Sequence, residues 1–75
     1  MKYVITDRGE VATGERMHVS LAAGLQGRVV AAGHYRVVGG GCRVEVFGRS
    51  YGFSLAADPR DAAAVARHLG IAQPG

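Results

Sequence analysis

Short runs of β-branched and aromatic residues, separated by glycines, predict a small sheet in the first two thirds of this chain. Residues 3–6 have the composition of a first strand, which Val11 extends after the break at Gly9. Residues 28–38 predict a long strand, and residues 42–47 predict a returning one. The three glycines between them predict a hairpin turn, because glycine adopts positive φ angles at little steric cost.

The alternation of side chains along the last two runs predicts how they pair. A two-residue turn at Gly40-Gly41 places the apolar residues on one face, which Val29 and Ala31 continue. A three-residue turn would place Val37 opposite Arg43, and such a slip moves side chains to the wrong face. We therefore predict the first register, with these facing pairs: Val37 with Val44, Tyr35 with Val46, Arg36 with Glu45, His34 with Phe47, and Ala32 with Arg49.

The large apolar residues from Phe47 onward lie at odd-numbered positions, opposite to the pattern of the returning strand. They are Phe47, Tyr51, Phe53 and Leu55, whereas the buried positions of the returning strand are even-numbered. Either a bulge or turn near Gly48 or Gly52 redirects the chain, or the second face of the sheet is also covered. In so short a chain the expected cover is another subunit, so this aromatic stripe predicts a homo-oligomer.

The clearest helical signal lies near the C-terminal end. Asp58 has the residue type of an N-cap, Pro59 suits the first helical position, and Asp61 lies in the first turn. Gly70 is the residue type that ends a helix. We therefore predict a helix over residues 59–69, whose apolar face is formed at helical spacing by Ala62, Val65, Ala66 and Leu69.

A shorter helix is predicted near residues 16–23, where Met17 and Leu21 share a face and Thr13 is the candidate cap. Val19 and Ser20 would suit a strand equally well. The expected fold is therefore α+β: an antiparallel sheet of three to four strands with its central hairpin about Gly40-Gly41. The helix over 59–69 packs on this sheet, together with the short helix near 16–23.

Composition and charge bound the class of protein. The chain has 75 residues, a net charge of +3 and one cysteine, Cys42, which predicts a single small domain over residues 1–75 without an intrachain disulfide. Eight of the nine basic residues are arginines, spread along the chain, which is typical of a GC-rich genome as well as of an anion-binding protein. No apolar run approaches the ~18–20 residues that span a membrane. We expect a cytoplasmic protein with no membrane partner.

No catalytic or metal-binding motif is present in the sequence. The histidines fall on different predicted elements without zinc-type spacing, and Gly39-Gly40-Gly41 lacks the Lys-Ser/Thr of a P-loop. We expect Cys42 to point into the sheet core. We expect no enzyme, no metal and no cofactor, because none of the possible nucleophiles or bases lies in a diagnostic motif: Ser20, Ser50, Ser54, Cys42, His18, His34 and His68.

The polar face of the hairpin is the first candidate for binding. Arginine forks match the geometry of phosphate and carboxylate groups, and an aromatic ring adds a stacking surface for a base. An ordinary solvated sheet face has the same composition, and that alternative stays open. The residues of this face are Arg36, Arg43, Arg49, His34 and Phe47.

A second candidate is the segment Gly48-Arg49-Ser50-Tyr51-Gly52. Its two glycines would allow the backbone to approach a ligand closely, although a simple bend in a strand explains the pattern equally well. His18 has two interpretations: a neutral histidine packed under the short helix, or a hydrogen-bond donor to a ligand or subunit.

Single residues and dipeptides along the chain resemble a group of short, uncharacterised proteins encoded in bacteriophage and prophage genomes. No functional residues carry over from this resemblance, which implies a context: small accessory phage proteins block a host protein or sequester a signalling nucleotide. The matching segments are Met17-His18-Val19, Val30-Ala31-Ala32-Gly33, Val46-Phe47-Gly48-Arg49-Ser50, Leu55 and Pro59-Arg60-Asp61.

These observations lead to one expected function and two alternatives. We expect a non-enzymatic, homo-oligomeric binding protein, of the phage accessory or counter-defence type, for an anionic nucleotide-like ligand. The alternatives are an inhibitor that docks on a host protein through an exposed aromatic stripe, and a nucleic-acid-binding module. The expected ligand residues are Arg36, Arg43 and Arg49 for charge, Phe47 or Tyr51 for stacking, and His18 and Ser50 in support.

Overall fold

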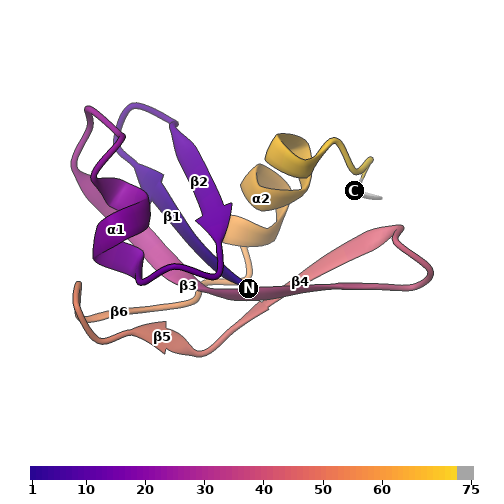
Figure 1. Ribbon diagram of the computed structural model, residues 1–75. Coiled ribbons are helices and arrows are strands. Elements are labelled where there is room, and N and C mark those ends of the chain that lie inside the picture. Colours follow the sequence, from indigo (N-terminus) through magenta and orange to yellow (C-terminus); the bar gives the residue numbers. More distant parts are fainter. Residues whose placement is uncertain (73–75) are drawn as a thin grey trace.

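Four antiparallel strands form the main sheet of the computed structural model, which describes residues 1–72 (Figure 1). The strand order is β2-β1-β3-β4, so the first strand lies inside the sheet. The fold is the predicted α+β class. The strands of the main sheet are β1 (Lys2–Thr6), β2 (Val11–Gly14), β3 (Val29–Val38) and β4 (Arg43–Phe47).

Three further features complete the fold. A two-stranded ribbon pairs β5 (Arg49–Ser50) with β6 (Leu55–Ala56). The helices are α1 (His18–Ala22) and α2 (Asp61–Leu69). The β3–β4 hairpin extends beyond the rest of the molecule, and the ribbon lies near α1 (Figure 1).

The predicted register of the central hairpin is confirmed. The facing pairs run from His34–Phe47 through Arg36–Glu45 to Val38–Arg43. The turn is wider than the predicted two residues, because it contains residues 39–42 and the N–H of Cys42 donates to the carbonyl of Val38 at 3.2 Å. All three of its glycines have positive φ values, of 64°, 70° and 92°. Residues with a side chain rarely adopt such angles, because the Cβ atom clashes with the backbone.

Cys42 is exposed in this turn, so the prediction that it points into the core was wrong. The strand begins at Arg43, one residue later than predicted. The alternation of the strand therefore does not apply to Cys42, and the turn lies outside both hydrophobic clusters.

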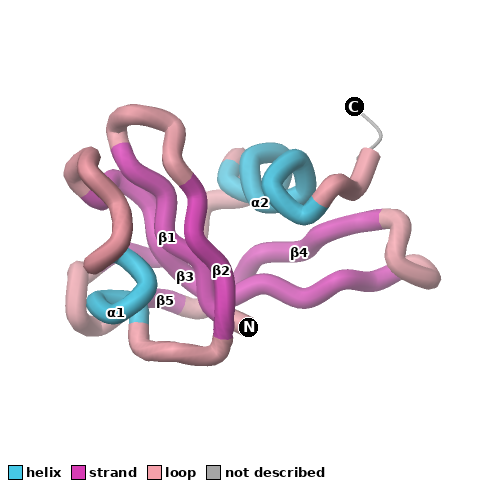
Figure 2. The backbone as a smooth tube through the Cα atoms, turned by 45° about the horizontal axis from the view of Figure 1, so that its top comes forward, coloured by secondary structure: helices cyan, strands magenta, loops and turns pink. Residues whose placement is uncertain are grey.

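The chain itself covers both faces of the main sheet (Figure 2). On one face, α2 buries Val65 and Ala66 against Tyr3 and Tyr35. On the other, Leu21 of α1 packs with Val4 and Ala32, and Phe53 and Leu55 lie at the margin of this cluster. Successive residues of a strand point to opposite faces, which is why Tyr3 and Val4 belong to different clusters.

This arrangement changes the argument for a homo-oligomer. The stripe that suggested a partner subunit included Phe53 and Leu55, and both are partly buried within their own chain. Tyr51 and Phe47 are the exposed members of the stripe. Self-association stays a prediction, but covering the second face does not require it.

A bend at Gly48 redirects the chain, as the first of the two alternatives predicted. Gly48 has a φ of 71°, and the β3–β4 pairing ends just before it at His34–Phe47. Arg49 then pairs with Ala56 and not with Ala32 as expected. The bend therefore separates two short surfaces that a continuous strand would have joined.

Both helices begin later than predicted. Met17 precedes α1 without a side-chain cap, and Thr13 cannot cap it because Thr13 pairs with Tyr3 inside the sheet. Before α2, Pro59 and Arg60 form a turn in which Asp58 Oδ1 accepts the amide N–H of Arg60 at 2.9 Å. Gly70 ends α2 as predicted. Within residues 1–72, neither helix has the length and apolar character needed to cross a bilayer.

Candidate functional site

The polar face of the hairpin brings together Arg36, Phe47 and His34. The imidazole of His34 stacks on the ring of Phe47 with centroids 5.7 Å apart and an interplanar angle of 26°. Arg36 Cζ lies 4.7 Å from the same ring centroid, which is cation–π distance. Phe47 is still 40% exposed, so part of this residue remains open to solvent.

Glu45 forms ion pairs with two of the arginines that were predicted to bind a ligand. Arg36 Nε lies 3.2 Å from Glu45 Oε1, and Arg43 Nη2 lies 3.5 Å from Glu45 Oε2. One carboxylate against two guanidinium groups leaves an excess positive charge. All three side chains are at least two-fifths exposed, and such surface pairs contribute at most about 1 kcal/mol. An incoming anion can therefore compete for these arginines.

Arg49 and Tyr51 form a second cation–aromatic pair on the other side of the bend. Arg49 Cζ lies 5.4 Å from the ring centroid of Tyr51. Tyr51 is 84% exposed, more than any other large hydrophobic residue described. Within residues 1–72, Arg49 has no carboxylate partner. A stacking ring and a guanidinium without a counter-ion thus lie together at the surface.

His18 and Ser50 have internal partners. The Nε2–H of His18 donates to the carbonyl of Gly33 at 2.8 Å, and the residue is buried. This matches the first interpretation of His18, a histidine packed under the short helix. Ser50 is fully buried and its Oγ accepts the N–H of Phe53 at 3.4 Å. Its hydroxyl stabilises the β5–β6 turn and is not exposed to a ligand, contrary to the expected supporting role.

His34 links the two cation–aromatic pairs. It stacks on Phe47 and makes a hydrogen bond with the backbone of Arg49. Its ring also meets that of His18 edge to face, with centroids 5.4 Å apart. Burial lowers the pKa of His34 from 6.5, and the nearby positive charges of His18, Lys2 and the N-terminal amine lower it further. The field around His34 is therefore positive, and the imidazole itself is neutral near pH 7.

Sequence reasoning missed Lys2 as part of this site. In the β1–β3 pairing, Lys2 is the cross-strand neighbour of His34, and its Nζ donates to the carbonyl of Glu15 at 3.1 Å. Only the pairing of the first strand with the third brings the two residues together. We call the following set the basic–aromatic surface: Lys2, His34, Arg36, Phe47, Arg49 and Tyr51.

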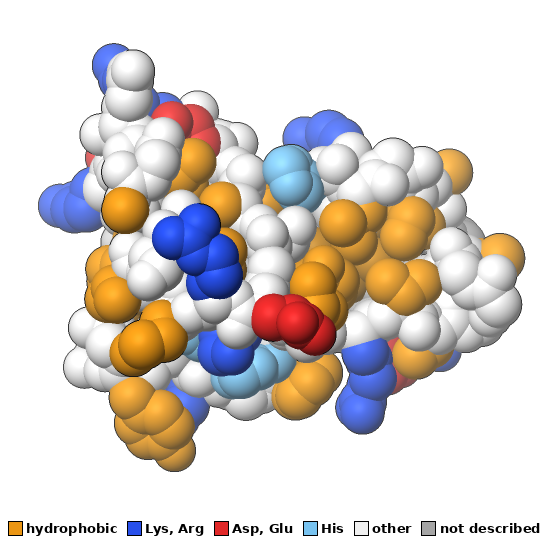
Figure 3. Space-filling view, viewed as in Figure 1, with side chains coloured by type: hydrophobic (Ala, Val, Ile, Leu, Met, Phe, Trp, Pro, Cys, Tyr) orange, Lys and Arg blue, Asp and Glu red, His pale blue; other side chains and the backbone are white. Residues whose placement is uncertain are grey.

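Basic side chains are dispersed over the face of the molecule that Figure 3 draws. On the face shown in Figure 3, Lys and Arg side chains lie singly among hydrophobic ones and do not form one large basic patch. Long-range attraction to anions is therefore modest, and recognition depends on the local pairing of guanidinium groups with rings.

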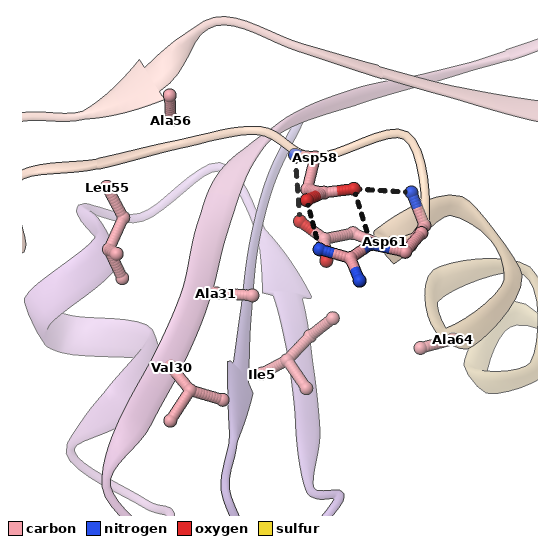
Figure 4. Close-up of a pocket in the computed structure, with 9 residues that line it drawn as sticks. Ile5, Val30, Ala31, Leu55, Ala56, Asp58, Asp61 and Ala64 are labelled. Atoms are coloured by element: carbon pink, nitrogen blue, oxygen red, sulfur yellow. Dashed lines mark hydrogen bonds and ion pairs between the residues drawn. The ribbon is translucent and has the colours of Figure 1, made fainter.

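A hollow of about 530 Å³ beside the start of α2 is a second possible site (Figure 4). Apolar side chains from β1, β3, β6 and α2 line most of it, and Asp58, Arg60 and Asp61 form its polar end. Arg60 Nη2 lies 2.9 Å from Asp58 Oδ2, and this partner holds the pKa of Asp58 at about 2. Asp61 Oδ2 accepts the hydroxyl of Tyr3 at 2.6 Å and the N–H of Asp58 at 3.1 Å. These groups stabilise the helix start, so the hollow is the weaker candidate.

Chemistry must carry the functional assignment, because comparison with known families, curated proteins and solved structures gives no match for this chain. The resemblance to short phage proteins stays a prediction. Among residues 1–72, no three His, Cys, Asp or Glu side chains gather where they could hold a metal ion.

Proposed function

We propose that this protein binds nucleotide-type anions, without catalysis, on the basic–aromatic surface. The pairing of Arg49 with Tyr51 carries the proposal, since the ring is 84% exposed and the guanidinium lies 5.4 Å from its centroid. A base stacks on the ring, and a phosphate accepts hydrogen bonds from the guanidinium fork.

The rest of the surface supports the same chemistry. Lys2 and the N-terminal amine add positive charge near His34, and Arg36 lies over Phe47. Anionic groups gain from this field, while the exposed rings favour ligands that also carry a planar base. A small phage-type protein with such a surface would act by sequestering a nucleotide, which is the context that the resemblance implies.

The test is an NMR titration of the wild-type protein with AMP and TMP, beside inorganic phosphate and adenosine as partial probes. We expect both nucleotides to shift the amide signals of residues 48–52 and the ring signals of Tyr51 and His34. Each partial probe should bind more weakly, because it offers only the phosphate or only the base.

Arg49→Ala should weaken nucleotide binding roughly tenfold to a hundredfold, the effect of losing a charged hydrogen bond. The matched control is Arg67→Ala, which removes the same charge from the exposed side of α2, across the sheet from the basic–aromatic surface. The proposal fails if the nucleotides shift no signals at millimolar concentration, or if the two variants bind equally well. Native mass spectrometry of gently purified protein adds the subunit count and the mass of any nucleotide carried through purification.

A protein target is the second candidate, carried by the apolar residues around Tyr51. Met17 and Val19 of the α1 region are exposed, and a Cβ on Gly52 would lie 3.3 Å from Val19 Cγ1. The β5–β6 turn, which contains Tyr51, therefore packs against Val19 of α1. A complex anchored by Tyr51 in an apolar pocket would persist at high salt, whereas phosphate binding weakens.

A further inference from the structure

We infer that the preferred ligand of the basic–aromatic surface is a single-stranded oligonucleotide that spans two stacking positions. This inference rests on the proposed function of the same surface and names its ligand class. A lone nucleotide would occupy one position and leave the other unused.

The structural basis is the repetition of one arrangement on either side of Gly48. Arg36 lies 4.7 Å from the ring centroid of Phe47, and Arg49 lies 5.4 Å from that of Tyr51. A base that stacks on either ring would take the place of the guanidinium over it, and that guanidinium would then bind the adjacent phosphate. Phe47 and Tyr51 are four positions apart along the chain, so their Cα atoms are at most about 14 Å apart even if the segment is extended. Bases a few nucleotides apart on one strand can therefore reach both.

The surface between the two pairs suits the linking phosphate. His34 occupies it, stacked on Phe47 and hydrogen-bonded to the backbone of Arg49. Lys2 is its cross-strand neighbour, held in place by the carbonyl of Glu15. A sugar–phosphate link across this position would meet the ammonium group of Lys2 and the positive field around His34.

The charge count also favours a short single strand over a duplex. Arg49, Lys2 and the shared Arg36 provide about three phosphate contacts, for which the slope of log affinity against log salt is about −2 on a single strand. Stacking on the two rings requires unpaired bases, and double-stranded DNA buries its base faces. The exposed rings would find no partner on a duplex.

The experiment measures binding of TMP and of oligothymidylates from two to about six nucleotides by calorimetry or fluorescence anisotropy. We expect affinity to rise roughly five- to a hundredfold between TMP and the length that reaches both rings, and then to level off. Phe47→Leu should abolish this rise with length, because it leaves only one ring for stacking. Tyr51→Leu should weaken the binding of every length.

Leucine keeps both positions apolar, and amide spectra of the variants verify that the fold is kept. If TMP binds but affinity does not increase with length, this inference fails and the proposed function stands. If neither TMP nor any oligothymidylate binds, both fail. Equal affinity for a duplex of the same length would also overturn the inference, because its bases cannot stack on the rings.

Discussion

Tyr3 and Asp61 join the first strand to the last helix through a hydrogen bond of 2.6 Å from the phenol to Oδ2. Tyr3 is fully buried. Burial raises the pKa of its hydroxyl, and the hydrogen bond to Asp61 raises it further, so Tyr3 remains a protonated donor. The bond closes the fold across 58 positions of sequence and fixes the start of α2 on the sheet.

Tyr3→Phe should therefore lower the free energy of unfolding by about 1–2 kcal/mol, because a hydrogen bond to a carboxylate is lost at a partly buried site. Urea unfolding at neutral pH measures the change. Tyr35→Phe is the matched control: Tyr35 is also buried, and its hydroxyl makes no hydrogen bond within residues 1–72. Equal losses in the two variants would show that the Tyr3–Asp61 bond contributes nothing specific.

Glu10 should make the stability of the fold depend on pH in the acidic range. Its carboxylate accepts the N–H groups of Gly27 at 2.7 Å and Gln26 at 3.0 Å, and the hydroxyl of Thr6 at 2.8 Å. The backbone bonds, first that of Gln26, hold its pKa below 4.5. The unfolded chain binds the proton more readily. The stabilisation by these hydrogen bonds is therefore complete above the pKa that Glu10 has in the unfolded chain. It is lost as the pH falls through the lower pKa of Glu10 in the folded protein.

Glu10→Gln should lower stability at neutral pH and make the decline on acidification shallower. Urea unfolding over a pH series measures both effects. Glu15→Gln provides the control, since Glu15 is exposed and its carboxylate has no hydrogen bond within residues 1–72. A parallel acid decline in wild type and Glu10→Gln would contradict the prediction.

Gly27 should not tolerate a side chain. A Cβ there would lie 2.7 Å from Asp7 Oδ1 and from Thr6 Oγ1, at the place where Glu10 holds the loop. Gly27→Ala should lower the free energy of unfolding by about 1–3 kcal/mol through overpacking. Gly24→Ala should change it little or stabilise the protein, because no atom lies within 4 Å of the added carbon. Thermal unfolding of the two variants measures both effects. A Gly27→Ala variant as stable as the wild type would contradict the close packing around Gly27.

His34 should report the arrival of an anion. Its pKa lies below 6.5 because of burial and the positive charges of His18, Lys2 and the N-terminal amine. Arg36 and Arg49 carry further charge on the same surface. A bound phosphate group offsets this field, so TMP should raise the pKa of His34, as measured by NMR titration of its ring signals. The ring signals of His68, exposed on α2, should not respond; an unchanged pKa of His34 would place the anion elsewhere.

Cys42 should react with a thiol reagent in the native protein. It is exposed in the glycine-rich turn, so no unfolding is needed for access. The labelling rate in buffer should match the rate in denaturant to within a few-fold. A native thiol that reacts only after unfolding would restore the predicted core position.

The sequence by itself determined the hairpin register and the course of α2. Both depend on local patterns: alternation on two strands joined by a short glycine turn, and apolar residues at helical spacing before Gly70. A slip by one residue would move Val44 or Val46 out of the core, so the pattern had one consistent solution. The guanidinium groups and rings of the site were likewise visible as residue types.

Only the tertiary structure decided which of these residues meet. The pairing of β1 with β3 joins Lys2 to His34, and the return of residues 53 and 55 to the second face removed the need for a partner subunit there. The bend at Gly48 placed Arg49 beside Tyr51 and buried Ser50. These contacts join segments far apart in sequence or depend on one φ angle, and local periodicity carries no information about either.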